Sequence, residues 1–325
     1  MIQDIAPHKF DNVYHNQPPC PDSYVLYYKD RTALIRRTGD TFDFLRFRDL
    51  EDGILKTGKS EGQSGISTYT YLFSIDQETF YLAERLPGTL GESPAGTLPE
   101  GCVMENIQFF RGGPPRYLAF AGITGYQLFL WYRSRRFCGR CGSPLRKDEK
   151  ERMMYCDKCH QMEYPKISPA VIIGVTDGSR LLMSKYAGRE YTRYALLAGF
   201  SEIGETLEET VKREVMEEVG LKVTNIRYYK NQPWSFSDTL LVGFFCDLEA
   251  PDEIRLDRNE LALAQWFQRE DIPLEDDSHA SLTHEMIRVF KDNRLPLPAD
   301  PGSAGCPQAP EESQADQKAE ALHTW

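Results

Sequence analysis

The sequence has no long apolar segment and no excess of positive charge, and each absence narrows what the protein does. No uninterrupted apolar run approaches the roughly 20 residues that a helix needs to cross a bilayer. The opening residues, MIQDIAPHKFDN, lack the basic and apolar regions of a secretory signal and the arginine-rich character of a transit peptide. The net charge of −11 disfavours broad electrostatic capture of nucleic acid as the main task. We therefore expect a cytoplasmic protein with no membrane partner.

Cysteine is too sparse and too unevenly placed for a disulfide framework. Of eight cysteines in 325 residues, four form two CxxC pairs, whereas Cys20, Cys102, Cys246 and Cys306 stand singly. In a cytoplasmic chain this distribution indicates metal binding together with ordinary thiols. The sequence also lacks internal repeats.

Length and composition predict soluble globular domains. A chain of 325 residues, 41% hydrophobic and 27% charged, accommodates two or three domains and at least one substantial core. We expect an N-terminal α/β domain over residues 1–132, a cysteine-containing module over 133–165 and a second α/β domain over 166–295. Residues 296–325 are rich in Pro, Ala, Gln and Glu and poor in large apolar groups, which predicts a disordered tail.

Alternating apolar residues and turn signals predict several elements. We expect hairpins over 69–86, with a turn at 76–78, and over 23–37. A helix is expected over 117–133, although Gly122 and Gly125 weaken this prediction. In the second α/β domain we expect strands at 171–176, 180–184 and 240–246, with Asp177–Ser179 as a hairpin turn.

The two CxxC pairs predict a structural zinc site. Cys138 and Cys141 are separated from Cys156 and Cys159 by fourteen residues, a spacing typical of zinc ribbons. Four thiolates complete a tetrahedral shell and leave no coordination position open for chemistry. His160 directly follows the second pair and is the alternative ligand.

The segment Gly199–Leu221, GFSEIGETLEETVKREVMEEVGL, predicts an acidic helix that binds a divalent cation. Glu214, Glu217 and Glu218 fall on one side of a helix, where like charges repel unless a cation lies between them. Taken alone, these carboxylates also suit the solvated face of an ordinary helix. The segment Thr206–Glu209 has the form of a capping box and Gly220 suits the helix end, while Leu207, Val211, Val215 and Val219 supply a packing ridge.

This segment resembles the Nudix box, G-x5-E-x7-R-E-U-x-E-E-x-G-U with U apolar, at every position. The resemblance implies a Nudix α/β/α sandwich that cleaves a nucleoside diphosphate linked to another group. A divalent cation, Mg²⁺ or Mn²⁺, neutralises the phosphates and activates water in such a site. Glu218 is then the first choice for general base and Glu217 the second, with Glu214 as a further catalytic carboxylate. Arg213 is expected to pair with Glu205.

A second motif narrows the substrate. Residues 231–239, NQPWSFSDT, resemble the SQPWPFPxS signature of NADH pyrophosphatases, the NudC-type family, and depart from it at Asn231, Ser235, Ser237 and Thr239. The resemblance covers roughly residues 130–290 and includes the zinc ribbon. It implies substrate contacts at these positions: Glu151, Tyr164, Phe200, Gln232, Pro233, Trp234, Ser235, Phe236, Ser237, Asp238 and Thr239.

The same resemblance implies further features of the site. The backbone carbonyl of Ala198 and the carboxylate of Glu260 join Glu214, Glu217 and Glu218 around the divalent cations. Arg111 is a candidate for a basic contact from the N-terminal domain. Family members are homodimers whose sites use residues from both subunits.

Together these features predict a zinc-containing Nudix hydrolase that cleaves NADH or NAD⁺ to NMN(H) and AMP. Removal of NAD caps from RNA 5′ ends is a further implied activity, with the basic residues between Arg133 and Arg152 guiding the RNA. A solvated basic surface explains those residues equally well. One alternative is a Nudix enzyme for ADP-ribose or dinucleoside polyphosphates. The other, from a different class, is an inactive zinc-ribbon interaction module.

Overall fold

The computed structural model describes residues 1–50, 69–84, 101–188, 193–273 and 281–295. The predicted tail at 296–325 lies outside these described residues. Met1–Arg294 forms one unit and Leu295–Trp325 a second.

Two small sheets and one helix make up the N-terminal α/β region. The helix α2 (Arg116–Ser134) contacts the 3-10 helix η2 (Ile107–Arg111) and one of the sheets. That sheet has the order β1 (Phe10–Asp11), β7 (Tyr69–Ile75), β8 (Glu78–Ala83), β2 (Tyr24–Leu26) and β6 (Leu45–Arg46), and η1 (Phe47–Asp49) follows β6. The other contains β3 (Tyr28–Lys29), β4 (Thr32–Thr38) and β5 (Thr41–Asp43), with β9 (Cys102–Asn106) paired to β4.

The predicted hairpin at 69–86 is confirmed by β7 and β8 as far as Ala83, and residues 85–86 lie outside the described part of the chain. The predicted hairpin over 23–37 is confirmed only in its second part, because its first segment is not one strand. It divides into β2, which pairs with β8 and β6, and β3, which pairs with β4. All three residues of β2 are buried, so the alternation that normally defines a half-exposed strand is missing.

The predicted helix over 117–133 is confirmed by α2, and its Gly122 has a packing reason. A Cβ atom on Gly122 would lie 2.6 Å from the ring of Phe110. The Tyr28 hydroxyl also donates a 2.6 Å hydrogen bond to the Gly122 carbonyl oxygen. Glycine therefore permits close packing of α2 against η2 and β3, and this outweighs its weak helix propensity.

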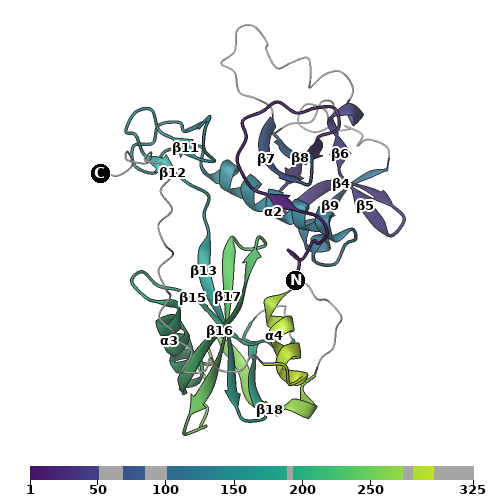
Figure 1. The fold of residues 1–325 in the computed structure, drawn as a ribbon. Coiled ribbons are helices and arrows are strands. Elements are labelled where there is room, and N and C mark those ends of the chain that lie inside the picture. The colour runs from purple at the N-terminus through teal and green to yellow at the C-terminus, as the bar shows by residue number, and fades with distance from the viewer. Residues whose placement is uncertain (51–68, 85–100, 189–192, 274–280, 296–325) are drawn as a thin grey trace, which may run out of the picture. The chain divides into compact units, whose positions relative to one another are not determined.

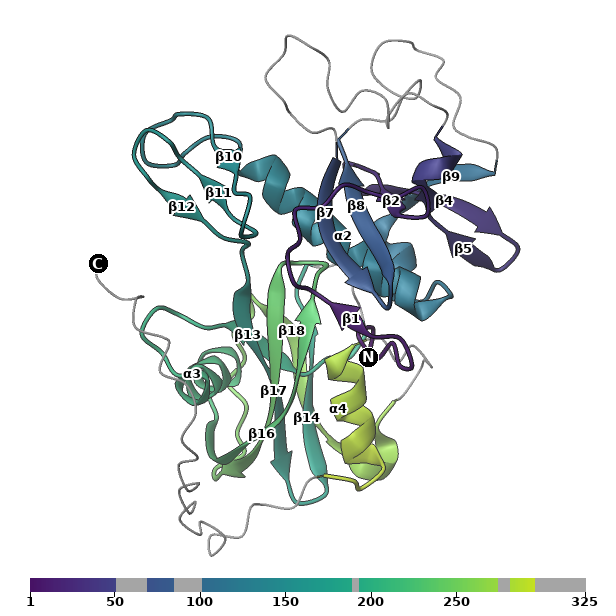
Figure 2. The ribbon, with the colours of Figure 1, turned by 45° about the horizontal axis from the view of Figure 1, so that its top comes forward.

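The cysteine-containing module carries a three-stranded antiparallel sheet. Its strands are β10 (Arg146–Lys147), β11 (Met154–Tyr155) and β12 (Met162–Glu163), as Figure 2 shows. The two CxxC turns lie before β10 and between β11 and β12, so the short strands connect the two halves of the cysteine cluster.

A mixed six-stranded sheet forms the second α/β region, with α3 (Leu207–Val219) on one face and α4 (Leu282–Lys291) on the other (Figure 1). This confirms the expected α/β/α sandwich. A 3-10 helix, η3 (Arg269–Asp271), contacts α4. The strand order is β16 (Lys222–Trp234), β17 (Thr239–Glu249), β13 (Ser168–Asp177), β14 (Arg180–Tyr186) and β18 (Leu261–Gln268), and β15 (Leu197–Phe200) pairs with β13.

The three strands predicted for this region are confirmed, and each is longer than expected. The turn between β13 and β14 is also confirmed, with Gly178 at φ 57°. The strand β13 is central because it runs parallel to β17 and antiparallel to both β14 and β15. Its pairing with β15 holds Ala198 opposite Ile172 and places the start of the acidic segment beside the core.

The helix α3 begins and ends where the sequence predicts. The Thr206 hydroxyl accepts a 3.2 Å bond from the Glu209 amide, and the Glu209 carboxylate accepts a 2.8 Å bond from the Thr206 amide. Gly220 ends the helix at φ 69°. Val211, Val215 and Val219 are fully buried against the sheet, and each contributes about 1.5–3 kcal/mol relative to an exposed side chain. Because this ridge fixes the position of α3 on the sheet, the carboxylates of α3 are held beside β15.

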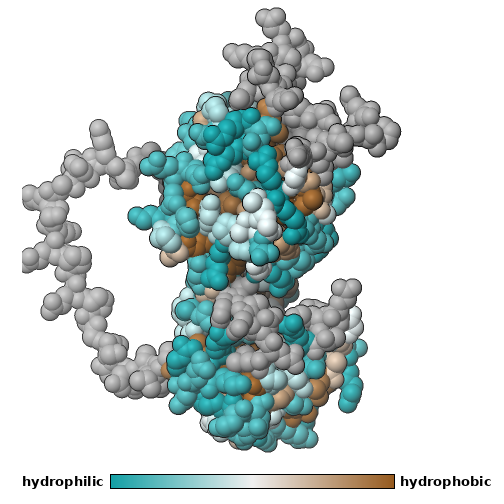
Figure 3. Space-filling view, turned by 90° about the vertical axis from the view of Figure 1, so that its right-hand side faces the viewer, coloured by the Kyte–Doolittle hydropathy of each residue, from teal (hydrophilic) through white to brown (hydrophobic). Residues whose placement is uncertain are grey.

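No helix in the described part of the chain is long and apolar enough to cross a membrane. On the face drawn in Figure 3, hydrophilic residues cover much of the described surface and hydrophobic residues form separate patches.

Candidate functional site

Gly199 of β15 packs directly against the side chain of Glu214 of α3. A Cβ atom on Gly199 would lie 1.9 Å from the carboxylate carbon of Glu214 and 2.0–2.3 Å from its two oxygens. Every residue except glycine would therefore displace this carboxylate. The first glycine of the Nudix box thus provides the space in which Glu214 lies, and the pairing of β15 with β13 fixes that space.

Arg213 makes the predicted pair with Glu205 and also connects two other carboxylates of this segment. Its Nε and Nη2 atoms donate to Glu205 at 2.5 and 2.9 Å, and its Nη1 donates to Glu214 at 2.7 Å and to Glu217 at 3.0 Å. Nη2 also donates to the carbonyl oxygen of Phe200 at 2.9 Å. The hydrogen bond from Arg213 lowers the pKa of Glu205 to about 2. The guanidinium group therefore fixes α3 to the turn before it and offsets part of the negative charge.

The carboxylates of the box differ in exposure. Glu218 is 2% exposed and Glu214 is 8% exposed, whereas the side chain of Glu217 is 59% exposed. Burial raises the pKa of Glu214, and the nearby carboxylates of Glu217 and Glu260 raise it further, against the lowering effect of Arg213. Glu260 precedes β18 and is remote in sequence, yet its charge acts on Glu214.

These residues fit a hard divalent cation by their donor chemistry. Two nearly buried carboxylates with other carboxylates close by form an unfavourable concentration of negative charge, which a divalent cation stabilises. In the described residues only the four cysteines bring three or more ligand atoms all within 4.8 Å of one another. The carboxylates are more widely spaced, and Arg213 lies between Glu214 and Glu217.

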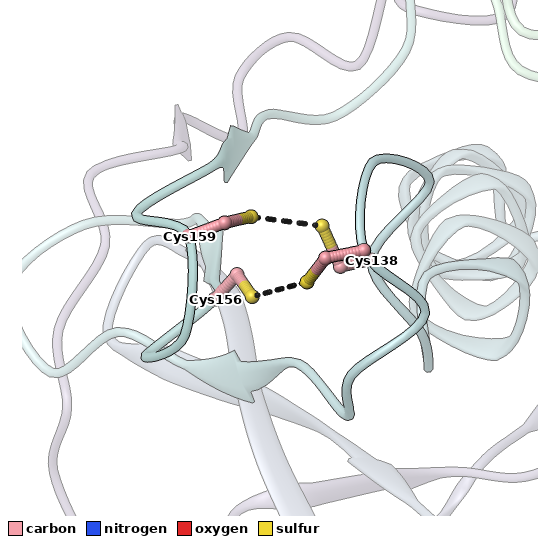
Figure 4. Close-up of side chains that lie close together, drawn as sticks. Cys138, Cys156 and Cys159 are labelled. Atoms are coloured by element: carbon pink, nitrogen blue, oxygen red, sulfur yellow. Dashed lines mark hydrogen bonds between the residues drawn. The ribbon is translucent and has the colours of Figure 1, made fainter.

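The four cysteines form the predicted metal cluster. Cys138 and Cys159 bring their Sγ atoms to 3.5 Å, as do Cys141 and Cys156 (Figure 4). Tetrahedral zinc with Zn–S bonds of about 2.3 Å places its sulfurs about 3.8 Å apart, whereas a disulfide requires about 2.05 Å. The cluster therefore fits zinc and excludes disulfides. The alternative ligand, His160, instead bonds through Nδ1 to the Tyr155 hydroxyl at 2.6 Å.

Trp234 and Phe236 form an aromatic pair with Arg111 of η2. Their ring centroids lie 4.8 Å apart, and the guanidinium carbon of Arg111 lies 4.8 Å from each centroid. Arg111 therefore contacts the segment 231–239, which the sequence predicts to bind the substrate. No local pattern could have identified this contact, because more than 120 residues separate its partners in the sequence.

Other side chains of the segment 231–239 point into the protein. Gln232 is fully buried, donates to the Gln3 side chain at 3.0 Å and accepts from the Leu282 amide at 2.7 Å. Ser235 and Thr239 are 5% and 4% exposed, and the hydroxyls of Ser237 and Thr239 lie 3.0 Å apart. The structure therefore connects this segment to α4 and to the chain's first residues, a connection that the sequence did not reveal.

The remaining predicted substrate contacts are accessible. The Tyr164 hydroxyl donates to the Glu151 carboxylate at 2.9 Å, so the structure brings these two residues together. Tyr164 is 53% exposed and Phe200 is 56% exposed. Both aromatic side chains thus present large surfaces on which a planar ring could stack.

The basic run 133–152 does not form one surface patch. Arg152 donates to Asn12 and to the Leu72 carbonyl oxygen, and Lys147 bonds to Thr70 and Glu84. These two cations attach the cysteine-containing module to β7 and its neighbours. Arg146 pairs with Asp157 at 2.9 Å within the module. Only part of the run remains available to an external anion.

Comparisons with known proteins agree with this geometry. The family model described as the NADH pyrophosphatase zinc ribbon domain matches residues 133–164, and the NUDIX domain model matches residues 166–289. Residues 133–289 thus resemble a zinc ribbon followed by a NUDIX domain. It is 41% identical over 160 residues to a protein of Klebsiella pneumoniae named NAD-capped RNA hydrolase NudC, covering 49% of this chain and 62% of that protein. A Salmonella heidelberg protein of the same name is 41% identical over 150 residues, covering 46% and 58%.

The chain spans about three fifths of the length of the curated relatives that it matches. A solved Nudix hydrolase from Nitrosomonas europaea is 26% identical, with a TM-score of 0.43, and the match covers 50% of this chain and 95% of that one. The family matches begin at residue 133, so they include the zinc ribbon and the Nudix domain and leave the preceding residues unassigned.

Proposed function

We propose that this Nudix protein hydrolyses the pyrophosphate bond of NADH or NAD⁺, releasing NMN(H) and AMP. The observation that carries the proposal is the close packing of the Glu214 carboxylate on Gly199, next to the buried Glu218. A fold seldom buries neighbouring carboxylates without positive charge nearby, and Arg213 offsets only part of their charge. The zinc ribbon match and the aromatic segment 231–239 support NAD(H) among the Nudix substrates.

The catalytic roles follow from burial and position. Glu214, Glu217, Glu218, Glu260 and the Ala198 carbonyl would hold Mg²⁺ or Mn²⁺. The cation supplies charge neutralisation for the two phosphates and lowers the pKa of water. Glu218 accepts a proton from the attacking water, the water oxygen bonds to one phosphorus, and the bridging P–O bond breaks. Each product leaves with one phosphate group. Arg213 positions Glu214 and Glu217 during this step.

Substrate recognition is assigned to the exposed aromatic and polar groups. Phe200 would stack on the nicotinamide ring, and the pair of Glu151 and Tyr164 would contact the substrate beside it. Trp234 and Phe236 supply further ring surfaces, and Pro233, Ser237 and Asp238 of the same segment are exposed or half-buried. Ser235 and Thr239 are buried and would contact the substrate only by way of small movements of this segment. The buried side chain of Gln232 supports this segment through Leu282 and Gln3.

We also propose that the protein forms a homodimer. Phe137, Ile167 and Ile203 are 61%, 63% and 104% exposed, and they lie in or next to the zinc ribbon and the acidic turn. These exposed apolar side chains are available to the contact between subunits. We place the protein in the cytoplasm, where reduced thiolates are available to hold zinc.

Removal of NAD caps from RNA is the second candidate activity. It is favoured by the relatives named NAD-capped RNA hydrolase at 41% identity. Free NAD(H) and capped RNA share the bond that is cut, so one acidic site serves both.

The experiment that tests the proposal compares substrates at equal concentration with Mn²⁺ present. We expect AMP release from NADH or NAD⁺ to exceed that from ADP-ribose and diadenosine polyphosphates. A preference for ADP-ribose would replace the proposed substrate, and absence of hydrolysis of every compound would favour the inactive interaction module.

A further inference from the structure

A buried chain of hydrogen bonds joins the segment 231–239 to the first residues of the protein. The side chain of Gln232 is fully buried. Its Oε1 atom accepts from the Leu282 amide at 2.7 Å, and its Nε2 atom donates to Oε1 of Gln3 at 3.0 Å. Leu282 is the first residue of α4, where the backbone amides have no acceptor within the helix. Gln232 thus connects three separate elements through one amide group.

The direction of these hydrogen bonds is determined by the backbone. The Leu282 amide can only donate, so Gln232 must turn its oxygen towards Leu282 and its Nε2 atom towards Gln3. Gln3 must therefore accept, and its own Nε2 atom lies 3.5 Å from the sulfur of Met1. Because that sulfur is a weak acceptor, the side-chain oxygen is the important atom of Gln3. A carboxylate oxygen at position 3 would serve equally well.

The residues on either side of Gln3 hold it in place. Ile2 and Ile5 are 4% and 7% exposed and belong to a hydrophobic cluster that includes residues of α2. Phe236 is partly buried and packs against the same cluster. The core of the N-terminal α/β region therefore supports both Gln3 and an aromatic side chain of the segment 231–239.

Loss of the acceptor at position 3 would act on the whole segment. A buried donor that loses its acceptor is unfavourable, so the backbone around Gln232 would shift until its Nε2 atom reaches another partner. Trp234 and Phe236 follow closely in the chain, and the proposed function assigns their ring surfaces to the substrate. The carboxylates assigned to bond cleavage belong to α3, a different element. Such a shift would weaken substrate binding more than the chemical step.

We propose that Gln3 is a positioning residue for substrate recognition by the segment 231–239. The inference rests on the proposed function and adds to it a residue of the N-terminal region that determines the affinity for NADH. Gln3 acts through Gln232 and does not touch the substrate.

Two variants at position 3 and two matched controls test this proposal. Gln3→Leu has a side chain of similar size and lacks the acceptor, whereas Gln3→Glu keeps an acceptor oxygen. The controls are Gln268→Leu and Gln268→Glu, because Gln268 accepts a 2.8 Å hydrogen bond from the Ser179 hydroxyl at the turn between β13 and β14. For each protein, kcat and KM for NADH, the Tm and the amide hydrogen exchange of residues 231–239 are measured.

Gln3→Leu is expected to raise KM about three- to tenfold at unchanged kcat and to speed hydrogen exchange in the segment 231–239. Gln3→Glu should restore both quantities to the values of the unmodified protein, and the two control variants should alter neither. Equal KM values for Gln3→Leu and Gln268→Leu would overturn the inference. A kcat that falls together with the Tm in Gln3→Leu, or a KM that stays high in Gln3→Glu, would also overturn it.

Hydrogen exchange separates this inference from the proposed function. If the unmodified protein cleaves no NADH, the proposed function fails, and the exchange of residues 231–239 then decides whether Gln3 positions the segment. Faster exchange in Gln3→Leu and normal exchange in Gln3→Glu would support the positioning role. Unchanged exchange in Gln3→Leu would exclude it.

Discussion

Replacing Gly199 by Ala tests the construction of the acidic site most directly. The added methyl group would lie 1.9 Å from the Glu214 carboxylate carbon, and ordinary contact requires about 3.4 Å. The carboxylate must therefore retreat by about 1.5 Å, since β15 is held in place by its pairing with β13. A misplacement of about 1 Å in a catalytic group costs roughly 10²-fold in rate. We expect AMP release from NADH to fall by about that factor.

The control for this variant is Gly112→Ala. A Cβ atom on Gly112 meets nothing within 4 Å, and its φ of −141° lies outside the left-handed region that favours glycine. We expect this control to keep full turnover. Zinc content, measured by atomic absorption, should match the unmodified protein in both variants, because neither glycine lies in the cysteine cluster.

A double variant separates the clash from a general defect. Glu214→Asp shortens the side chain and removes the atoms that an alanine at position 199 would meet. The stability lost in Gly199→Ala should therefore be partly recovered in the double variant, as measured by urea denaturation. Wild-type turnover and Mn²⁺ affinity in Gly199→Ala, or strictly additive losses of stability in the double variant, would refute the reasoning.

Four further results are expected. Arg111→Gln should raise KM for NADH about three- to tenfold by removing the cation from Trp234 and Phe236, whereas Arg37→Gln, which removes a similar contact with Phe109, should leave steady-state kinetics unchanged. Arg213→Lys should lower the Tm and slow turnover, because an ammonium group does not reach Glu205, Glu217 and the Phe200 carbonyl oxygen together; unchanged thermal unfolding would count against this role. The hydrogen bond from Arg227 lowers the pKa of Asp247 below its usual 3.8, so the stability that this carboxylate provides is present above about pH 4 and is lost as the pH falls through the lowered pKa. Unfolding of Asp247→Asn should accordingly differ from that of the unmodified protein at pH 7 and converge with it in acid, and a constant difference would exclude this contribution. Removal of zinc by a chelator should expose residues 133–164 to protease, with Cys246→Ser as a control that retains zinc, and equal protection with and without metal would contradict a structural site.

Local patterns in the sequence predicted the elements that depend on local chemistry. The capping box at Thr206, the valine ridge of α3 and the turn at Gly178 all lie where the sequence places them. The two CxxC pairs identified the cysteine cluster because their spacing specifies both the turns and the donor atoms. These features need few distant partners, and so one segment contains all the necessary information.

The contacts between distant segments could not be predicted in this way. Gln232 bonds to Gln3, and Arg111 lies against Trp234, although each pair is separated by more than 120 residues. Arg152 belongs to a basic run typical of a solvated surface, yet burial lowers its pKa and its donors bond to Asn12 and Leu72. Such contacts depend on the tertiary arrangement, which leaves no local pattern around either partner.

The role of Glu218 allows the sharpest test of the proposed function. The measurement is Mn²⁺-dependent AMP release from NADH by the unmodified protein and by Glu218→Gln, with zinc content and thermal unfolding recorded for both. We predict that the variant folds, keeps its zinc and loses about 10²- to 10⁴-fold in turnover, the range expected for removal of a general base. Turnover equal to that of the unmodified protein would contradict the assignment of the acidic helix as the catalytic centre.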